Sequence, residues 1–197
     1  MKHYTIARTH GAPDWSAVDA LAIDEQLWRP PVDISAQAQI AWDDEQLYVR
    51  LSAREKHIRA EHTGPLGMPC EDSCLEFFFS PTPGDPRYFN IEINPNACLY
   101  LGFGDGQDLT RLLPERDWLR AEARRTGDGW AAEYVVPFAF VRMFVPGFKP
   151  VSGGSLRANC YKCGDLTQAE HYLAWSPCTS DEPSFHRPQD FGLMTFE

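Results

Sequence analysis

Hydrophobic and polar residues alternate along most of this chain. The clearest run lies at 47–54, where Leu47, Val49 and Leu51 fall on one face of the segment and polar or aromatic side chains on the other. A period of two residues is typical of a β-strand that buries one face. Runs of the same kind recur along the chain, and clusters of glycine, proline and aspartate separate them.

These runs predict an all-β fold. Short strands that follow one another at regular spacing, with almost no helix, favour a β-sandwich of about ten antiparallel strands. One short helix is expected at 138–143. No linker-like stretch is long enough to mark a domain boundary, so residues 1–197 are expected to form a single domain. The predicted strands lie at 4–8, 38–42, 47–54, 72–79, 87–94, 97–103, 119–125, 130–136, 156–163, 172–175 and 193–196.

Polar side chains gather on one face of three of these predicted strands. In the strand at 72–79, Leu75 and Phe77 occupy one face and Glu76 the opposite one. The polar faces of the three strands carry Glu76, Asn90, Glu92, Arg157, Asn159 and Tyr161. Such rows supply the hydrogen-bond donors and acceptors that a small ligand needs. A solvated sheet face has the same pattern, so the alternation leaves both interpretations open.

The C-terminal part of the chain contains an aromatic candidate for ligand contact. Trp175 ends a predicted strand and is followed by a proline-rich loop that contains His186. A tryptophan in this position is either a core residue or a flat platform on which a sugar ring or another planar ligand stacks. His186 is expected to orient the loop by hydrogen bonding.

The composition excludes some partners. The formal net charge of −10 disfavours nucleic acid and anionic membranes, because both need clustered lysine and arginine. No window approaches the ~20 apolar residues that span a bilayer. The N-terminus also lacks the apolar run of a signal peptide. We therefore expect a cytoplasmic protein if the chain is complete, and otherwise a secreted protein whose signal peptide has been removed.

The six cysteines are expected to be reduced thiols. Cys70 with Cys74, and Cys160 with Cys163, have the spacing of a four-thiolate zinc site. Residues three apart on a strand point to opposite faces, which argues against Cys160 and Cys163 binding one ion together. The metal content is left open.

Common catalytic motifs are absent from the sequence, among them Gly-x-Ser-x-Gly and the phosphate-binding glycine loop. Glu76 and Glu92 are nevertheless a pair of carboxylates of the kind that glycoside hydrolases use, which keeps an enzyme acting on a sugar derivative as an alternative. His57 or His62 with Met68 could supply an axial haem pair, and a haem-binding domain is therefore a further alternative.

Several short segments, taken together in their order and spacing, carry a resemblance to a known family. They are Ala41-Trp42-Asp43-Asp44 with Leu47-Tyr48-Val49, Pro69-Cys70-Glu71-Asp72-Ser73-Cys74-Leu75-Glu76-Phe77-Phe78, Gly129-Trp130 with Glu133 and Pro137, Asn159, and Trp175-Ser176-Pro177 with Phe191-Gly192. On these segments nearly the whole chain resembles the family 9 carbohydrate-binding modules, most closely the stand-alone family 9-like proteins. The resemblance implies a β-sandwich that binds sugars, typically at chain ends between two tryptophan platforms, and often carries structural calcium.

The resemblance also assigns roles to single positions. Trp175 matches one platform, Glu76 an acidic hydrogen-bonding position and Asn159 an asparagine of the binding strand. Two positions depart from the family pattern, because Cys70 stands where the second tryptophan is expected and Asn90 where the family places a sugar-binding arginine. Losing one stacking face removes about 1–1.5 kcal/mol of binding free energy. The fold follows from the resemblance, whereas a glucan or xylan ligand does not.

We therefore expect a non-catalytic carbohydrate-binding protein that takes a mono- or oligosaccharide. The expected ligand-binding residues are Trp175, Glu76, Asn90, Glu92, Asn159, Tyr161 and His186.

Overall fold

The computed structural model describes residues 1–106 and 108–197. Within these ranges the chain forms fourteen β-strands, one α-helix (α1, Phe138–Phe144) and three short 3-10 helices. The strands are β1 (His3–Arg8), β2 (Leu21–Ile23), β3 (Glu25–Leu27), β4 (Ser35–Trp42), β5 (Gln46–Arg54), β6 (Cys74–Ser80), β7 (Tyr88–Ile93), β8 (Leu99–Gly104), β9 (Thr110–Arg111), β10 (Glu122–Arg125), β11 (Gly129–Pro137), β12 (Ser155–Gly164), β13 (His171–Ala174) and β14 (Gly192–Phe196).

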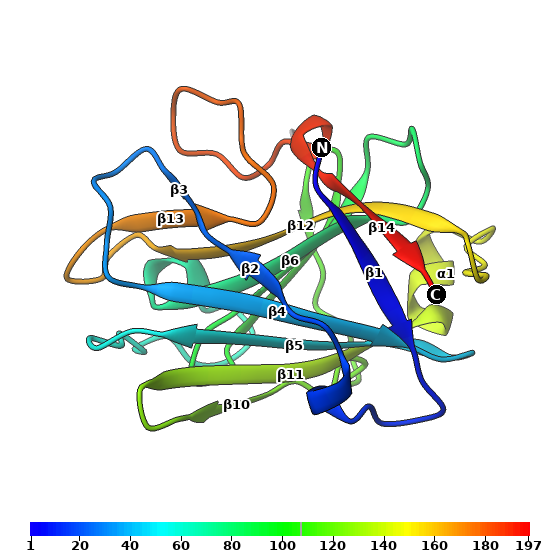
Figure 1. The fold of residues 1–197 in the computed structure, drawn as a ribbon, viewed down its shortest axis with the longest axis horizontal. Coiled ribbons are helices and arrows are strands. Elements are labelled where there is room, and N and C mark those ends of the chain that lie inside the picture. Colours follow the sequence, from blue (N-terminus) through cyan, green and yellow to red (C-terminus); the bar gives the residue numbers. More distant parts are fainter. Residues whose placement is uncertain (107) are drawn as a thin grey trace.

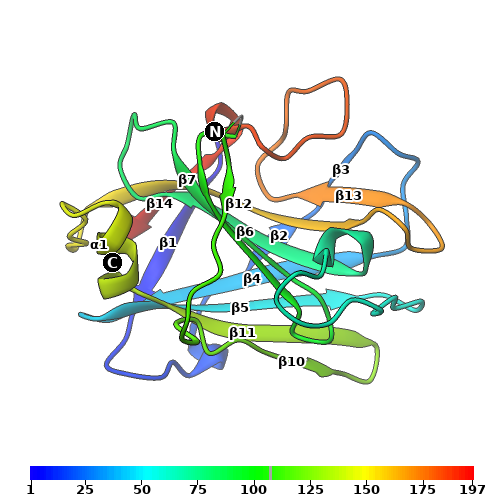
Figure 2. The same ribbon diagram turned by 180° about the vertical axis from the view of Figure 1, so that it is seen from behind.

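The strands form one continuous, strongly curled sheet (Figures 1 and 2). Its order is β10-β11-β5-β4-β1-β14-β12-β6-β7-β8-β9, with β2 beside β4, β13 beside β12 and β3 beside β13. We call the part from β10 to β4 the first half and the part from β14 to β9 the second half. The curl brings the two halves face to face, and their inward side chains form the main core.

The strand β1 joins the two halves. Residues His3 to Ile6 pair with β14, whereas Ala7 and Arg8 pair with β4. Both pairings are parallel, and Figure 1 shows β1 in dark blue beside the red β14. The first and the last strand of the chain therefore hold the sheet together at its middle.

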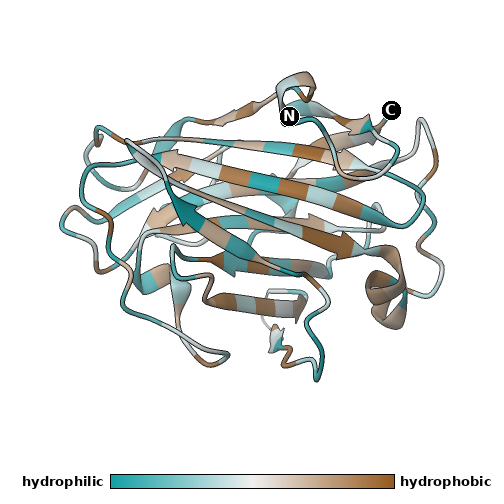
Figure 3. Ribbon diagram, turned by 90° about the horizontal axis from the view of Figure 1, so that it is seen from below, coloured by the Kyte–Doolittle hydropathy of each residue, from teal (hydrophilic) through white to brown (hydrophobic). Residues whose placement is uncertain are grey.

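The alternation seen in the sequence produces the core directly. Leu47, Val49 and Leu51 of β5 are buried from the first half, and Phe77 and Phe79 of β6 are buried from the second. Figure 3 shows the same alternation as hydrophobic and hydrophilic bands along the strands. Each fully buried side chain of this size contributes about 1.5–3 kcal/mol to folding through the hydrophobic effect. Both halves also contribute aromatic side chains to the main core, among them Trp130 from the first half and Phe89 from the second.

A second, smaller apolar cluster lies on the outer face of the second half. Phe78 and Tyr161 belong to it because their parity on β6 and β12 is opposite to that of the core residues. The C-terminal loop folds back over this face, and its Phe185 stacks on Tyr161 with ring centroids 4.0 Å apart. The loop covers only part of the outer face and leaves a pocket beside it.

The all-β prediction and the short helix at 138–143 are confirmed. The expectation of about ten strands is too low, since the sequence did not reveal β2, β3 and β9, which have only two or three residues each. The expectation of purely antiparallel strands is wrong at β1. Among the described residues, no helix is long and apolar enough to cross a membrane.

Candidate functional site

A pocket of about 270 Å³ opens on the outer face of the second half, between the sheet and the C-terminal loop. Its floor is built by alternate residues of β6 and β7, and its walls come from β8, the end of β12, β13 and loops. The lining residues are Trp28, Met68, Cys70, Glu76, Asn90, Glu92, Tyr100, Leu109, Cys163, Asp165, Tyr172, Pro183, Ser184, Phe185 and His186. Four of the seven residues predicted as ligand contacts therefore meet here: Glu76, Asn90, Glu92 and His186.

Two carboxyl groups lie side by side on the floor. Glu76 of β6 and Glu92 of β7 are direct partners across the antiparallel ladder, and both are buried. Burial, together with the neighbouring Glu92, raises the pKa of Glu76 well above its ordinary value. Burial also raises the pKa of Glu92 to about 7. The pair therefore holds fewer than two negative charges near neutral pH, because like charges in a desolvated site oppose one another.

The floor carries hydrogen-bonding capacity that no protein group uses. Asn90 donates from Nδ2 to Glu92 Oε1 over 3.0 Å. Asn90 Oδ1 and Glu92 Oε2 are buried and have no hydrogen-bond partner among the described residues. An unsatisfied buried acceptor costs about 1–3 kcal/mol, so a ligand that donates hydrogen bonds here removes a penalty as well as adding a contact.

Aromatic side chains form the walls of the pocket. Tyr100 of β8 stands opposite Glu92 in the strand register, and the Arg111 guanidinium covers the Tyr100 ring at 4.6 Å. Trp28 and Tyr172 meet edge to face with ring centroids 5.5 Å apart. Sequence analysis does not predict these three aromatic residues as part of the site. Trp28 in particular reaches the pocket from a segment far in sequence from the strands that form the floor.

The backbone of Trp28 is unusual. Its φ angle is +55°, in the left-handed region that bulky residues seldom occupy. A hydrogen bond from Trp28 Nε1 to the Ser180 carbonyl, 2.7 Å long, holds the indole against the C-terminal loop. Strained backbone that is fixed by tertiary contacts is often found at ligand sites, and here it lies at the pocket wall.

His186 fastens the C-terminal loop to the sheet, as the sequence predicts for this residue. Its Nδ1 lies 2.8 Å from the Tyr88 hydroxyl. Its ring stacks on Phe78 with centroids 5.5 Å apart, and burial lowers its pKa. The uncharged imidazole therefore forms part of the pocket wall and holds the C-terminal loop against the sheet.

The prediction of an exposed platform at Trp175 is wrong. Trp175 is only 4% exposed and belongs to the main core between the two halves. It shares its strand parity with Leu173, which also points inward, whereas Tyr172 and Ala174 point to the outer face. The aromatic residue that this strand presents to the pocket is Tyr172.

Asn159 and Tyr161 lie beneath the site rather than in its lining. Asn159 bonds the backbone of Ser176 twice, donating to its carbonyl and accepting from its N–H, each over 2.8 Å. The Tyr161 hydroxyl donates to the Phe185 carbonyl over 3.3 Å. Both side chains position the strand and loop that border the pocket, and neither appears in its lining.

The cysteines are divided between the two faces of the sheet. Cys160 points into the main core, whereas Cys74 and Cys163 point to the outer face with Glu76. The four-thiolate zinc arrangement weighed from the sequence is therefore wrong. The expected calcium also finds no fit in this group, because Ca²⁺ takes six to eight oxygen ligands whereas two of these three ligand atoms are sulfur.

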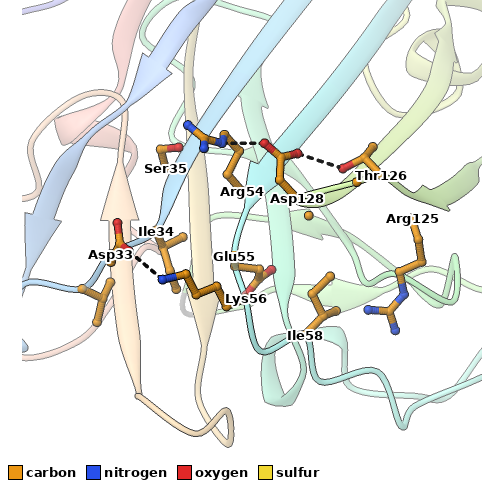
Figure 4. A pocket seen from close by; sticks show the side chains of 13 residues that line it. Asp33, Ile34, Ser35, Arg54, Glu55, Lys56, Ile58, Arg125, Thr126 and Asp128 are labelled. Atoms are coloured by element: carbon orange, nitrogen blue, oxygen red, sulfur yellow. Dashed lines mark hydrogen bonds and ion pairs between the residues drawn. The ribbon is translucent and has the colours of Figure 1, made fainter.

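A larger hollow of about 620 Å³ lies on the first half, beside the loops at 32–35 and 125–129 (Figure 4). Four of its charged groups form two ion pairs, Arg54 with Asp128 at 2.7 Å and Lys56 with Asp33 at 3.6 Å. No aromatic side chain appears among the described residues that line it. The larger hollow thus contains solvated ion pairs, whereas the smaller pocket contains buried acceptors without partners. The smaller pocket is therefore the better candidate site.

The residues considered as an axial haem pair have different surroundings in the structure. His62 is held by Glu71, with its Nε2 2.8 Å from the carboxylate. His57 lines a separate hollow together with His171. Met68 borders the candidate pocket.

The comparison with protein families decides the relationship. The model of carbohydrate-binding family 9 matches residues 9–196. The chain belongs to this family. The match covers nearly the whole length, as the resemblance of the sequence segments predicts, and the pocket therefore lies in a family 9 fold.

Three solved structures share this fold. A "putative carbohydrate-binding protein" from Bacteroides uniformis is 27% identical, with a TM-score of 0.84, and the alignment covers 100% of this chain and 99% of that one. A family 9 module from Caldicellulosiruptor kristjanssonii in complex with cellotriose is 13% identical, with a TM-score of 0.73 and coverage of 100% and 94%. The same organism's module in complex with glucose is 13% identical, with a TM-score of 0.72 and coverage of 100% and 96%. No functionally curated protein matches the chain.

Proposed function

We propose that this family 9 protein binds carbohydrate without catalysing a reaction, and that the sugar occupies the pocket over Glu76, Asn90 and Glu92. The observation that carries the proposal is the buried, unpartnered pair of acceptors, Asn90 Oδ1 and Glu92 Oε2, which face a pocket with aromatic walls. Sugar hydroxyls donate to such acceptors, while the apolar faces of a sugar ring pack on aromatic rings.

The size of the pocket favours a single sugar ring. Its volume of about 270 Å³ lies just below the range of about 300–1,000 Å³ for drug-sized ligands. The family relationship and the sugar complexes of similarly folded modules support the same ligand class. We infer that the ligand is a monosaccharide or the terminal residue of a short oligosaccharide.

The stacking surface differs from the one expected from the sequence. Tyr100, Tyr172 and Trp28 take the place of Trp175 and of the second tryptophan, whose position is occupied by Cys70. Tyrosines offer a smaller ring and a polar hydroxyl, so the proposed binding relies more on hydrogen bonds than on stacking. We therefore expect a modest affinity, together with selectivity for the arrangement of hydroxyl groups on the sugar ring.

Isothermal titration calorimetry with hexoses, pentoses and their short oligomers tests the proposal. We expect saturable heat for at least one sugar, and a loss of about 3–10-fold in affinity for Asn90→Ala or Tyr100→Ala, since each removes about 0.5–1.5 kcal/mol of contact. Lys56→Ala in the larger hollow of Figure 4 is the matched control and should leave the affinity unchanged.

Absence of heat with every sugar, or an equal loss in Lys56→Ala, would overturn the proposal. Chromogenic glycosides added to the same preparations separate binding from catalysis. We expect no release of the chromophore, and release that disappears in Glu76→Gln would instead support the two-carboxylate enzyme.

A further inference from the structure

Two thiols and a carboxyl group meet at the base of the pocket. Cys74 of β6 and Cys163 of β12 are direct partners across the antiparallel ladder, and Glu76 follows Cys74 by two residues on the same face. The two Sγ atoms and a Glu76 oxygen all lie within 4.8 Å of one another. The strand period and the register thus place three ligand atoms around one point.

The distances suit a tetrahedral metal ion. Zinc–sulfur bonds of about 2.3 Å and zinc–oxygen bonds of about 2.0–2.2 Å place neighbouring ligand atoms about 3.5–3.8 Å apart. In the structure Cys163 Sγ lies 3.0 Å from Glu76 Oε1, to which it donates a hydrogen bond. This hydrogen bond brings the thiol and the carboxylate oxygen close enough to share one ion once the bridging proton is lost.

The cluster holds protons that a cation would replace. All three residues are buried, so each group must stay protonated or gain a positive partner. A divalent cation bound to two thiolates and one carboxylate removes most of the charge that burial opposes.

The cluster can be reached from solvent through the pocket. Glu76 and Cys163 belong to the lining of the pocket, and so does Cys70, whose thiol is placed near the same carboxylates. A fourth ligand position therefore faces the pocket, where Cys70 or an oxygen of solvent can fill it. This arrangement provides both the entry path and the open position of a metal site.

We propose that Cys74, Glu76 and Cys163 bind a thiophilic divalent cation, Zn²⁺, with Cys70 or solvent as the fourth ligand. Soft sulfur ligands in a tetrahedral set select zinc over calcium and magnesium, which take oxygen ligands. The site goes beyond sugar binding and does not depend on it. The bound ion fixes the Glu76 carboxylate at the floor of the pocket.

Cobalt(II) is the probe for this site, because thiolate ligation gives it an intense near-ultraviolet charge-transfer band and tetrahedral geometry gives it strong visible bands. We expect the purified, chelator-treated and reduced protein to bind one equivalent of Co²⁺ with both features, and equimolar Zn²⁺ to displace it. Cys74→Ser and Cys163→Ser should each weaken Co²⁺ binding by at least tenfold, and Glu76→Gln should also weaken it.

The matched control is Cys160→Ser, which removes a thiol on the opposite face of the same strand. It should retain the cobalt spectrum. Far-ultraviolet circular dichroism of the metal-free proteins checks that each variant folds, and Glu76→Gln keeps the test decisive if a serine variant does not. Lack of a charge-transfer band in the folded wild-type protein overturns the proposal.

Two further outcomes would also overturn it: an equal loss of the band in Cys160→Ser, or oxidation of Cys74 and Cys163 to a disulfide that persists under the reducing conditions of the assay. The titrations with sugar and with metal are separate measurements. Failure of one proposal therefore leaves the other to be judged on its own result.

Discussion

Glu76 and Glu92 show how a pair of residues sets the properties of a surface. Side chains of the same charge stand opposite each other on neighbouring strands, where a like-charged pair is normally destabilising. The pKa of Glu92 rises to about 7 because its carboxyl group is buried. A buried pair of this kind lowers stability, and titratable groups with perturbed pKa values in a pocket are candidates for a functional site.

This cost makes stability depend on pH. The pKa of Glu92 rises from 4.5 in the unfolded chain to about 7 in the folded protein, so its contribution to stability is lost as the pH rises through this interval. The substitution Glu92→Gln removes the ionisable group. We therefore expect the melting temperature of this variant, minus that of wild type, to become larger as the pH is raised from 5 to 8. Thermal denaturation at constant ionic strength measures the difference.

Glu115→Gln, in an exposed loop, serves as the control for the pH series. Its melting temperature should follow that of wild type at each pH. Parallel curves for Glu92→Gln and wild type would show that Glu92 does not titrate in this interval.

At the scale of residues, the sequence predicts the floor of the pocket better than its walls. Glu76, Asn90 and Glu92 follow from strand parity, because a period of two fixes which side chains share a face. The platform prediction for Trp175 is wrong, although Trp175 lies two residues after the apolar Leu173 and therefore on the same face of the strand. This local pattern indicates a core residue. Trp28 and Tyr100 come together through the tertiary fold, and no local pattern of the sequence contains that information.

Packing between elements explains the position of Trp175. The last strand, β14, begins at Gly192, and a Cβ atom at this position would lie 2.5 Å from Trp175 Cζ3 and 3.0 Å from the Lys2 carbonyl oxygen. The absence of a side chain at Gly192 lets the indole lie against β14 while this strand pairs with β12. One glycine thus accommodates the largest side chain at this junction.

Gly192→Ala is expected to lower the free energy of unfolding by about 1–3 kcal/mol, the usual cost of overpacking a core that cannot yield. Urea denaturation measures the change. Gly127→Ala is the matched control, since nothing lies within 4 Å of its added Cβ atom, and it should be neutral or slightly stabilising. Equal effects of the two substitutions would contradict a packing role for Gly192.

At the scale of elements, strands with four or more residues are predictable because their alternation is long enough to recognise. The short strands β2, β3 and β9 are not, since two or three residues contain no period. The parallel pairing of β1 with β14 joins residues near the two ends of the sequence. Its register depends on the complete fold, and no local sequence signal specifies it.

A buried ionic network ties the two halves of the molecule together. Lys162 of β12 is fully buried and lies 3.4 Å from Glu55, the residue that follows β5. Trp130 of β11 donates to the same carboxylate over 2.6 Å, and His171 Nε2 lies 2.8 Å from Lys162 Nζ. Burial and the neighbouring Lys162 lower the pKa of His171 to about 4, so its imidazole is uncharged near neutral pH.

Lys162→Met is expected to lower the free energy of unfolding by about 3–5 kcal/mol, because it leaves the Glu55 carboxylate buried without its cation. The double variant Lys162→Met with Glu55→Gln should recover part of this loss, and chemical denaturation of the full cycle gives the coupling. Arg54→Ala breaks the exposed pair with Asp128 and should change stability by less than about 1 kcal/mol. If the changes in unfolding free energy of the two single variants add up to that of the double variant, Lys162 and Glu55 are not coupled.

The position of β1 between the halves has a consequence for synthesis of the chain. A ribosome makes β1 before β14, and His3 to Ile6 can reach their partner β14 only after residues 192–196 have emerged. Until then this segment presents an unpaired strand edge, which is a site of unwanted pairing in a nascent chain. Because contacts so distant in sequence form slowly, the pairing of β1 with β14 is expected to be completed late in folding.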